Sequence, residues 1–411
     1  MTAPRPPMLP VADALALLLA AAQPLTEHEI VPTLSANGRV LALAQSSQLD
    51  VPPMDNTQMD GYAVRSADCS DGAARLRVAQ RIPAGHVGQP LLPGTAARIF
   101  TGALIPDGAD AVVMQEQCTA DGDDVIVAHA PASGEWIRRR GEDIRAGDDI
   151  LPAGTRLRAQ ELGLAASVGL ATLPVVRKVK VAVFFTGDEL AMPGEVLKPG
   201  AIYNSNRFTL RGLLENLGCE ITDYGIVPDT LVATRDTLRR AAQEHDLIIT
   251  SGGVSVGEED HIKPAVESEG RLTMWQIAVK PGKPLAFGEV DRAAQNQGKA
   301  FFLGLPGNPV SSFVTFLLFV RPFILRLQGV NSVTPQAYAL RAGFTWPKPD
   351  RRNEFLRARI NADGSVALFP NQGSGVLTST VWGDGLIDNP AGQAIAPGDI
   401  VRFIPFTELL N

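Results

Sequence analysis

One stretch, residues 251–260, carries glycines and side chains that suit a phosphate group and a divalent cation. Ser251 and Ser255 supply hydroxyl donors. Gly252 and Gly253 let backbone N–H groups approach a bound anion closely. The carboxylates that end the stretch would repel a bare phosphate, but they suit one that is bridged by Mg²⁺. The stretch therefore predicts a site for an anionic ligand.

Further polar loops have the same character, and they are residues 186–189, 204–206, 227–229, 280–284 and 306–312. Residues 204–206 can cap a helix and bind an anion at its N-terminus. Lys280 and Lys283 stand on either side of a rigid turn and offer two point charges to phosphate-like groups. Each loop alone could be an ordinary cap or turn. A shared ligand explains all of them together.

The elements that must position these loops alternate between strand and helix. Apolar runs at 179–185, 219–224, 247–250 and 301–305 alternate with helical patterns, of which 207–217 and 231–245 are the clearest. This alternation predicts a parallel sheet that helices cover on both faces. Ligands bind at the carboxyl ends of the strands in such sheets, which is where the polar loops fall.

The rest of the chain divides by composition, and 411 residues are enough for two to four domains. Residues 1–50 are predicted to be mostly helical. Residues 51–143 are dense in Gly, Pro and Asp and contain short alternating runs, so we expect a small β-rich domain. Residues 337–411 predict a second small β domain.

Composition excludes several classes of protein. A net charge of −7 and only 6% aromatic residues argue against nucleic acid as a partner. Three scattered cysteines make neither a disulfide framework nor a thiolate metal site, and five scattered histidines make a zinc site improbable. The apolar run at 14–22 fits an amphipathic helix better than a signal peptide. The run at 310–320 is too short to span a bilayer. We expect a soluble, cytoplasmic protein that does not bind membranes.

With these motifs in order, the chain resembles the MoeA family of molybdopterin molybdenumtransferases of molybdenum cofactor biosynthesis, which is related to the C-terminal domain of gephyrin. The matching segments are residues 55–63, 101–103, 141–144, 186–190, 227–229, 251–260, 280–284, 306–312 and 373–375. Two positions depart from the family pattern: Thr57 stands where serine is expected and His261 where tyrosine is usual.

The resemblance implies an elongated, four-domain, α/β plus β protein that forms a homodimer. Residues 1–50 and 144–177 would form a discontinuous dimerisation and linker domain, and 51–143 the β-rich inserted domain. Residues 178–329 would form the molybdopterin-binding α/β domain with a parallel-rich sheet, and 330–411 a C-terminal β barrel. The active site would lie between the α/β domain of one subunit and the β domains of its partner.

The implied reaction takes adenylylated molybdopterin and molybdate as substrates, uses Mg²⁺, and releases AMP and molybdenum cofactor. The implied catalytic residues are Asp60, Thr101, Asp143, Glu189, Asp229 and Asp260, of which Glu189, Asp229 and Asp260 would ligate Mg²⁺. The implied binding residues are Ser205, Asn206, Ser251, Gly252, Gly253, Ser255, Lys280, Lys283, Pro306, Gly307, Asn308, Pro309 and Ser311. Arg351 or Arg352, together with Ser374, would contact molybdate.

Two alternatives remain open at this stage. The chain could be a non-enzymatic, gephyrin-like scaffold, although all the expected carboxylates are present. It could also be the adenylyltransferase that makes the adenylylated pterin, because that enzyme shares the α/β domain, although the additional β domains argue against this. That adenylyltransferase and downstream molybdoenzyme chaperones are expected as partners. A preference between molybdate and tungstate does not follow from the sequence.

Overall fold

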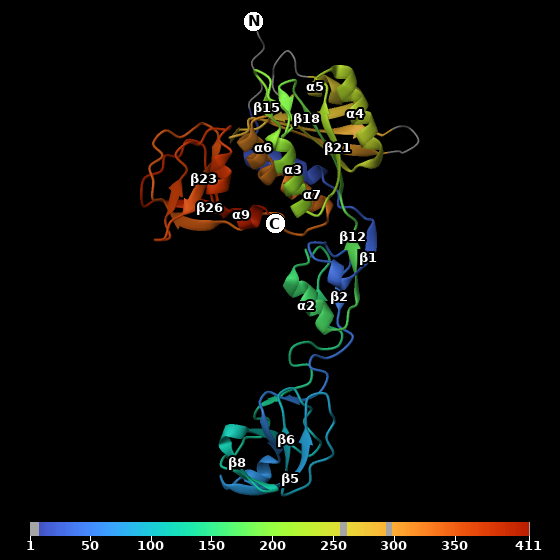
Figure 1. Cartoon of the computed structure of the whole chain (residues 1–411), viewed down its shortest axis with the longest axis vertical. Coiled ribbons are helices and arrows are strands. Elements are labelled where there is room, and N and C mark those ends of the chain that lie inside the picture. The colour runs from blue at the N-terminus through green and yellow to red at the C-terminus, as the bar shows by residue number, and fades with distance from the viewer. Residues whose placement is uncertain (1–7, 255–260, 293–297, 411) are drawn as a thin grey trace.

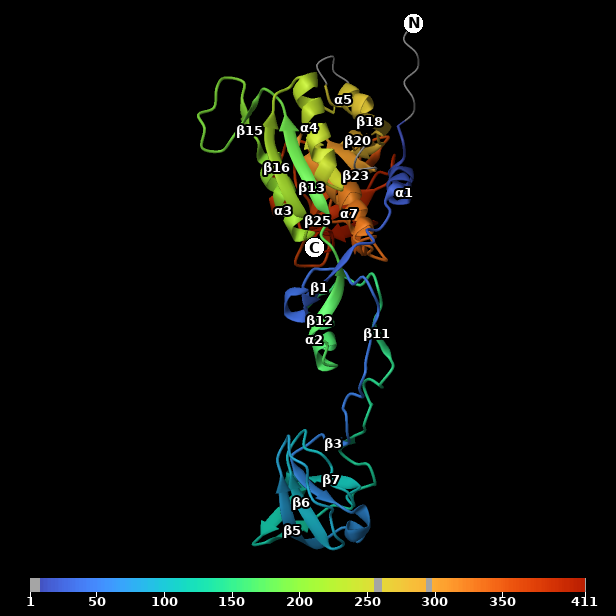
Figure 2. The ribbon, with the colours of Figure 1, turned by 90° about the vertical axis from the view of Figure 1, so that its right-hand side faces the viewer.

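The computed structural model describes residues 8–254, 261–292 and 298–410. The chain is elongated (Figure 1), with an α/β unit and a C-terminal sheet at one end and a β-rich domain at the other. A narrow region in which the chain runs outward and later returns connects the two ends (Figure 2). We call it the hinge region and define it by residues 28–50 and 144–176.

Short antiparallel pairs hold the outgoing and returning segments of the hinge region together. Strand β1 (His28–Pro32) pairs with β12 (Thr172–Val176), and β2 (Gln45–Ser46) pairs with β11 (Asp149–Leu151). The 3₁₀ turn η1 (Thr33–Ser35) and helix α2 (Ala159–Ser167) cover a small core that includes Leu41, Leu157 and Leu173. The prediction that residues 1–50 are mostly helical is therefore wrong.

Helix α1 (Val11–Ala21) is the one α-helix that the structure describes within residues 8–50. Its buried residues, Ala14 and Leu18, belong to the main core of the α/β unit, and the helix packs against α7 (Arg321–Leu327). Thus α1, which the resemblance assigns to the discontinuous domain, shares its core with the α/β unit.

The β-rich domain is a six-stranded sheet in the order β7-β4-β6-β5-β9-β8. Its strands are β4 (Gly61–Val64), β5 (Ala74–Ile82), β6 (Thr95–Ile99), β7 (Ala111–Met114), β8 (Cys118–Asp121) and β9 (Asp124–Val127). The strands β3 (Asn56–Thr57) and β10 (Ile137–Arg138) pair where the domain joins the hinge region, and 3₁₀ turns lie at η2 (Ser66–Cys69) and η3 (Gln115–Gln117).

The α/β unit contains a six-stranded sheet in the order β16-β13-β17-β21-β20-β18. The strands are β13 (Lys180–Thr186), β16 (Glu220–Val227), β17 (Leu247–Ser251), β18 (Gly270–Gln276), β20 (Pro284–Asp291) and β21 (Lys299–Leu305). The first four in this order are parallel, as predicted, whereas β20 and β18 run antiparallel. The sheet is therefore mixed. A short parallel pair, β14 (Leu190–Ala191) and β15 (Ile202–Tyr203), lies beside it.

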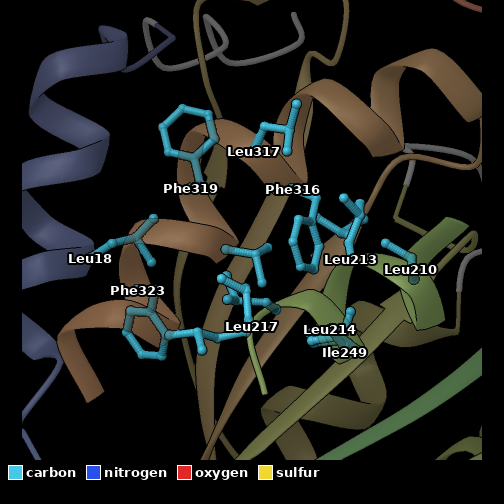
Figure 3. Close-up of a cluster of buried hydrophobic side chains, with 14 of the residues drawn as sticks. Leu18, Leu210, Leu213, Leu214, Leu217, Ile249, Phe316, Leu317, Phe319 and Phe323 are labelled. Atoms are coloured by element: carbon cyan, nitrogen blue, oxygen red, sulfur yellow. The ribbon is translucent and has the colours of Figure 1, made fainter. Parts of the chain in front are cut away.

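Helices cover both faces of this sheet because its central strands are apolar on both sides. Along β13, Val181, Val183 and Phe185 join the core beneath α3 (Ser205–Asn216), and the alternate residues join the core beneath α4 (Leu231–Glu244) and α5 (Ile262–Glu269). Figure 3 shows the first of these cores, where Leu18, Leu213 and Phe316 gather from α1, α3 and the helix that follows β21.

That last helix, Pro309–Leu327, is long and apolar enough to cross a membrane, but 89% of its most apolar window is buried inside the molecule. It consists of α6 (Pro309–Thr315), a π-helical turn (Phe316–Val320) and α7. Pro322 has no N–H to continue the regular ladder, which accounts for the turn that precedes it. The sequence correctly predicts a buried helix here.

The C-terminal sheet runs in the order β19-β23-β25-β26-β22, with β24 paired to β23. Its strands are β19 (Val279–Lys280), β22 (Tyr338–Arg341), β23 (Asn353–Ile360), β24 (Val366–Leu368), β25 (Gly385–Asn389) and β26 (Ile400–Pro405). The short helices α8 (Thr378–Trp382) and α9 (Phe406–Leu409) accompany it. A single bridge, Ala342 to Val366, joins its far ends. It is a curled half-barrel, not the fully paired barrel that the resemblance implies.

Candidate functional site

The loops that follow the parallel strands meet in a cleft of about 710 Å³. We call it the strand-end cleft. Its lining residues are Thr186, Gly187, Glu189, Leu190, Ile202, Asn204, Asn206, Asp229, Ser251, Gly252, Gly253, Val254, Lys280, Pro281, Gly282, Lys283, Pro306, Gly307, Asn308, Pro309, Ser311, Arg352, Gln372, Gly373 and Ser374. The parallel register explains this convergence, because Phe185, Ser251 and Leu305 are paired neighbours at the same edge of the sheet.

Asn206 holds three of these loops together at the floor of the cleft. Its Nδ2 donates to Ser251 Oγ and to the carbonyl oxygen of Gly307, both at 2.8 Å. Ser251 Oγ in turn donates to the carbonyl oxygen of Pro306 at 3.0 Å. The start of α3, the end of β17 and the turn after β21 are therefore fixed relative to one another before any ligand binds.

Buried polar atoms of the strand-end cleft are left without a hydrogen-bond partner in the described part of the chain. They are Thr186 Oγ1, Asn204 Nδ2 and Asn206 Oδ1. Asn204 uses its Oδ1 to cap α3 by accepting from the Arg207 N–H at 3.2 Å, which leaves its Nδ2 available. Buried polar groups nearly always find a partner, so these atoms are candidates for ligand contacts.

Gly252 and Gly253 are required by the shape of this edge. Both have positive φ angles, of 102° and 62°. A Cβ on Gly252 would lie 2.5 Å from the carbonyl oxygen of Thr186, and one on Gly253 would lie 2.8 Å from Thr186 Oγ1. Only glycine lets the loop after β17 approach the loop after β13 this closely.

Lys280 links the strand-end cleft to the C-terminal sheet. In the strand register, Lys280 of β19 is paired with Glu354 of β23. The Lys280 Nζ lies 3.0 Å from Glu354 Oε1 and 3.4 Å from Asp350 Oδ2. Arg352 forms a two-pronged ion pair with Asp350, at 2.9 Å for each prong. Lys280 and Arg352, which are far apart in the chain, are thus held side by side because both pair with Asp350.

The carboxylates in this network are held ionised. Burial would raise the pKa of Glu354, but hydrogen bonds from Trp346, from the Asp350 N–H and from Lys280 outweigh it and lower the pKa. The Arg352 side chain holds the pKa of Asp350 well below its usual range. Both carboxylates stay negative at neutral pH, so Lys280 and Arg352 stay anchored to them.

A buried arginine shapes the loop that brings Ser374 to the cleft. Arg357 is fully buried, and its guanidinium donates to the carbonyl oxygen of Gly373 at 3.2 Å and to Ser379 Oγ at 3.0 Å. The N–H of Val310, at the start of α6, donates to the carbonyl oxygen of Ser374 at 2.9 Å. The C-terminal sheet therefore reaches the strand-end cleft directly.

Two of the three predicted magnesium ligands, Glu189 and Asp229, line the cleft. The third, Asp260, lies outside the described residues, as does the predicted binding residue Ser255. No group of three His, Cys, Asp or Glu side chains among the described residues is placed to hold a metal by itself. Two carboxylates still fit Mg²⁺, because that ion commonly takes one or two carboxylates together with phosphate oxygens of the substrate.

The predicted acidic residues of the β-rich domain do not reach the strand-end cleft of the same chain. Asp60 directly precedes β4 and Thr101 follows β6 in that domain, and Asp143 precedes Ile144, which bridges to Val51 at the start of the returning segment of the hinge region. The β-rich domain lies at the opposite end of the molecule from the α/β unit (Figures 1 and 2). Asp60 Oδ1 accepts from Thr101 Oγ1 at 2.6 Å and from the Thr101 N–H at 2.8 Å. These bonds, with help from the nearby Arg98, lower the pKa of Asp60. Asp143 is exposed.

Sequence reasoning proposed most of the cleft and missed some of it. Ser205 is the first residue of α3 and is not among the lining residues, whereas the preceding Asn204 is. Asn204 and Thr186 belong to the predicted loops 204–206 and 186–189, but neither was assigned an individual role, although the preference for asparagine at helix N-caps favours Asn204. Gln372 was missed. Gln372 could not be found from spacing, because its loop reaches the cleft through the tertiary structure.

The fold is that of a multidomain protein whose polar cleft lies at the carboxyl ends of the parallel strands of its α/β unit. Residues 9–169 match the MoeA N-terminal region (domain I and II), 182–326 match the probable molybdopterin binding domain, and 339–406 match the MoeA C-terminal region (domain IV). The chain belongs to the MoeA family of molybdopterin molybdenumtransferases and is therefore a transferase.

Relatives align over nearly the whole chain. The molybdopterin molybdenumtransferase of Haemophilus influenzae is 40% identical over 395 residues, which are 94% of this chain and 96% of the relative. Molybdopterin molybdenumtransferase 2 of Mycobacterium tuberculosis is 36% identical over 406 residues, 95% of each chain. The crystal structure of the molybdopterin biosynthesis moeA protein from Pyrococcus horikoshii OT3 superimposes with a TM-score of 0.84 at 29% identity, covering 97% of this chain and 100% of that one.

Proposed function

We propose that this protein inserts molybdenum into molybdopterin, starting from adenylylated molybdopterin and molybdate and releasing AMP. One observation carries the proposal. In a member of this family, the strand-end cleft brings two lysines, an arginine, two carboxylates and unpartnered amide and hydroxyl groups to one place. Together these groups complement a phosphorylated substrate and an oxyanion.

The residues divide by what they would hold. The Gly253 N–H and the unpartnered side-chain amide of Asn204 would hold the substrate phosphate. Ser251 Oγ and the Gly252 N–H donate to the carbonyl oxygens of Pro306 and Leu305, so these two residues would shape the loop around it. Lys280 and Lys283 neutralise phosphate or oxyanion charge from the opposite side. Arg352 and Ser374 come from the C-terminal sheet, and we assign them to molybdate.

Glu189 and Asp229 would hold Mg²⁺. When bound, the ion would offset negative charge on the phosphates during cleavage of the pyrophosphate link. Glu189 is exposed, so it can take up a ligand without breaking a buried contact. We propose the same role for Asp260.

We further propose a homodimer in which the partner subunit supplies the second half of the site. Asp60, Thr101 and Asp143 match family motifs, yet they cannot serve the cleft of their own chain because of the distance between the two ends (Figure 1). A second copy in the opposite orientation would place its acidic loops beside the first strand-end cleft. There, Asp60 would orient the attacking water, and Thr101 would keep it ionised.

The test mixes purified protein with adenylylated molybdopterin, Mg²⁺ and molybdate, and follows AMP release together with cofactor formation. We expect molybdate-dependent AMP release that stops when Mg²⁺ is omitted. Tight pterin binding without AMP release would contradict the enzymatic proposal and support a scaffold. Formation of adenylylated pterin from ATP and molybdopterin would support an adenylyltransferase.

A further inference from the structure

A second cleft, of about 760 Å³, lies at the opposite end of α3 from the strand-end cleft. It is lined by residues of the hinge region, of the α/β unit and of the C-terminal helix α9, so we call it the three-way cleft. Of its lining residues, Glu215 and Asn216 end α3, Arg321 begins α7, and Thr407 and Glu408 belong to α9. A 12-residue helix is about 18 Å long, so the two clefts are separate sites.

Cations predominate in the three-way cleft, although the chain as a whole is acidic. Arg39, Arg156, Arg158, Lys178 and Arg321 line it, against the carboxylates Glu215 and Glu408. Several of the charged groups in and around the cleft already form ion pairs. Glu215 pairs with Arg211 at 2.9 Å, Arg39 pairs with Glu29 at 2.5 Å, and Arg158 pairs with Glu161 at 2.7 Å. Neither Arg156 nor Lys178 forms a salt bridge in the described part of the chain.

The backbone aims two of these arginines at the same space. Leu157 is fully buried in the small hinge core, and residues on either side of it in an extended segment point the other way. Arg156 and Arg158 therefore face the cleft together. Arg156 donates to the carbonyl oxygen of Asn216 at 2.8 Å, which fixes its guanidinium at the end of α3.

Arg156 and Arg321 also repel each other. Burial and, to a smaller extent, the positive charge of Arg156 lower the pKa of Arg321 to about 10, against an opposing effect of Glu408. Burial also lowers the pKa of Arg156. Both groups remain protonated at neutral pH, so two like charges, one buried and one half-buried, are held near each other. Such an arrangement costs free energy that a bound anion would offset.

We propose that the three-way cleft binds a phosphate group, either as free phosphate or as the phosphate of a nucleotide. Capping of α3 by Arg156 explains one hydrogen bond but not why Arg321 and Lys178 gather at the same point. A phosphate accepts several charge-assisted hydrogen bonds at once and suits converging arginines. Because the cleft is lined by three parts of the molecule, the ligand also fastens the hinge region to the α/β unit. This inference is independent of the proposed reaction.

The test is a titration of the full-length protein with inorganic phosphate and with AMP, against chloride at equal ionic strength. The dependence of hydrogen–deuterium exchange on ligand concentration both locates the binding and measures its strength at each cleft separately, whereas a rise in melting temperature reports binding at either cleft. We expect protection of residues 36–40 and 155–158. Tighter binding of AMP than of phosphate would identify a nucleotide as the ligand, and equal affinities would identify the free anion.

Variants separate this site from the strand-end cleft. Arg156→Gln should weaken phosphate binding at the three-way cleft by about tenfold or more, the effect of losing one charge-assisted hydrogen bond. Lys178→Gln, at an exposed position, tests the same cleft without threatening the fold. Arg271→Gln is the matched control, because Arg271 is exposed on β18 and neither it nor its ion-pair partner Glu289 lines the cleft. Lys283→Gln removes a cation of the strand-end cleft and should leave protection of 155–158 unchanged.

Two results would overturn the proposal. One is wild-type protein that shows no phosphate-dependent protection of residues 36–40 and 155–158. The other is protection that survives undiminished in both Arg156→Gln and Lys178→Gln. Neither result bears on AMP release from adenylylated molybdopterin, so failure here leaves the proposed function standing.

Discussion

The strand-end cleft and the acidic loops of the β-rich domain use the same kinds of side chain in opposite ways. In the cleft, Asn206 and Ser251 join loops from several strands within one chain. In the β-rich domain, Asp60 and Thr101 satisfy each other on a partly exposed surface. The cleft is already organised as a binding site in one chain. The acidic pair does not line the strand-end cleft of its own chain, and this difference is the reason for proposing a partner subunit.

The largest effect on activity is expected from removing one carboxylate from the β-rich domain or one from the strand-end cleft. Asp60→Ala and Glu189→Ala should each lower AMP release by at least about a hundredfold, the usual scale for a positioned acid or base. Neither side chain is buried, so the melting temperature should hardly change. Full turnover in both variants would contradict the carboxylate mechanism.

Mixing these two inactive variants tests the shared site directly. If the site spans two subunits, half of the randomly mixed dimers carry one intact site, and about a quarter of the wild-type activity should return. Equal amounts of each variant are mixed after partial denaturation and refolded, with each variant alone as the control. No recovery, although mixed dimers are present, would place both residues in a site formed within one chain.

A second effect separates the two lysines of the strand-end cleft. Both Lys280→Ala and Lys283→Ala should weaken binding of adenylylated molybdopterin about tenfold or more. Lys280→Ala should also destabilise the protein by about 1–3 kcal/mol, because it removes a partner of the fully buried Glu354. Titration and thermal denaturation of both variants measure the two effects. Equal stability would show that the link to the C-terminal sheet contributes nothing.

A smaller effect concerns the glycines. Gly85 and Gly252 both have positive φ angles, but a Cβ on Gly85 meets nothing within 4 Å whereas one on Gly252 meets the Thr186 carbonyl oxygen at 2.5 Å. Gly85→Ala should therefore cost about 1–2 kcal/mol of stability from the backbone alone. Gly252→Ala should cost more and should also weaken substrate binding. Equal costs in denaturant titrations would show that the close approach of the two loops is not needed.

The smallest effect is a shift with pH. Thr101→Val removes the hydroxyl that lowers the pKa of Asp60, so that pKa should rise and the acid limb of the pH–rate profile should move to higher pH. Glu354 provides the contrast in stability. Because its pKa is lowered in the folded state, its contribution is complete above the usual glutamate pKa of about 4.3 and is lost as the pH falls through the lower folded value. Profiles of Thr101→Val that match the wild type would remove Thr101 from its assigned role.

Much of the fold followed from local patterns, but some strand directions did not. The alternation of apolar runs and helical patterns correctly predicted that β16, β13, β17 and β21 are parallel. The direction of β20 and β18 could not be predicted, because an apolar run has the same pattern in either direction. The hinge strands β1 and β2 were missed because segments of five and two residues are stabilised mainly by their distant partners.

The sequence by itself determined which loops meet at the strand-end cleft. Parallel strands end at one edge, so the residues after each strand, such as Ser251, Gly252 and Asn308, had to meet there. Only the tertiary structure decided what joins them. Lys280 enters the C-terminal sheet, Arg357 shapes the loop that carries Ser374, and Arg156 of the hinge region shares a cleft with Arg321 of α7. These contacts join residues that are far apart in the chain, and they depend on how whole domains pack, which no local pattern of residues encodes.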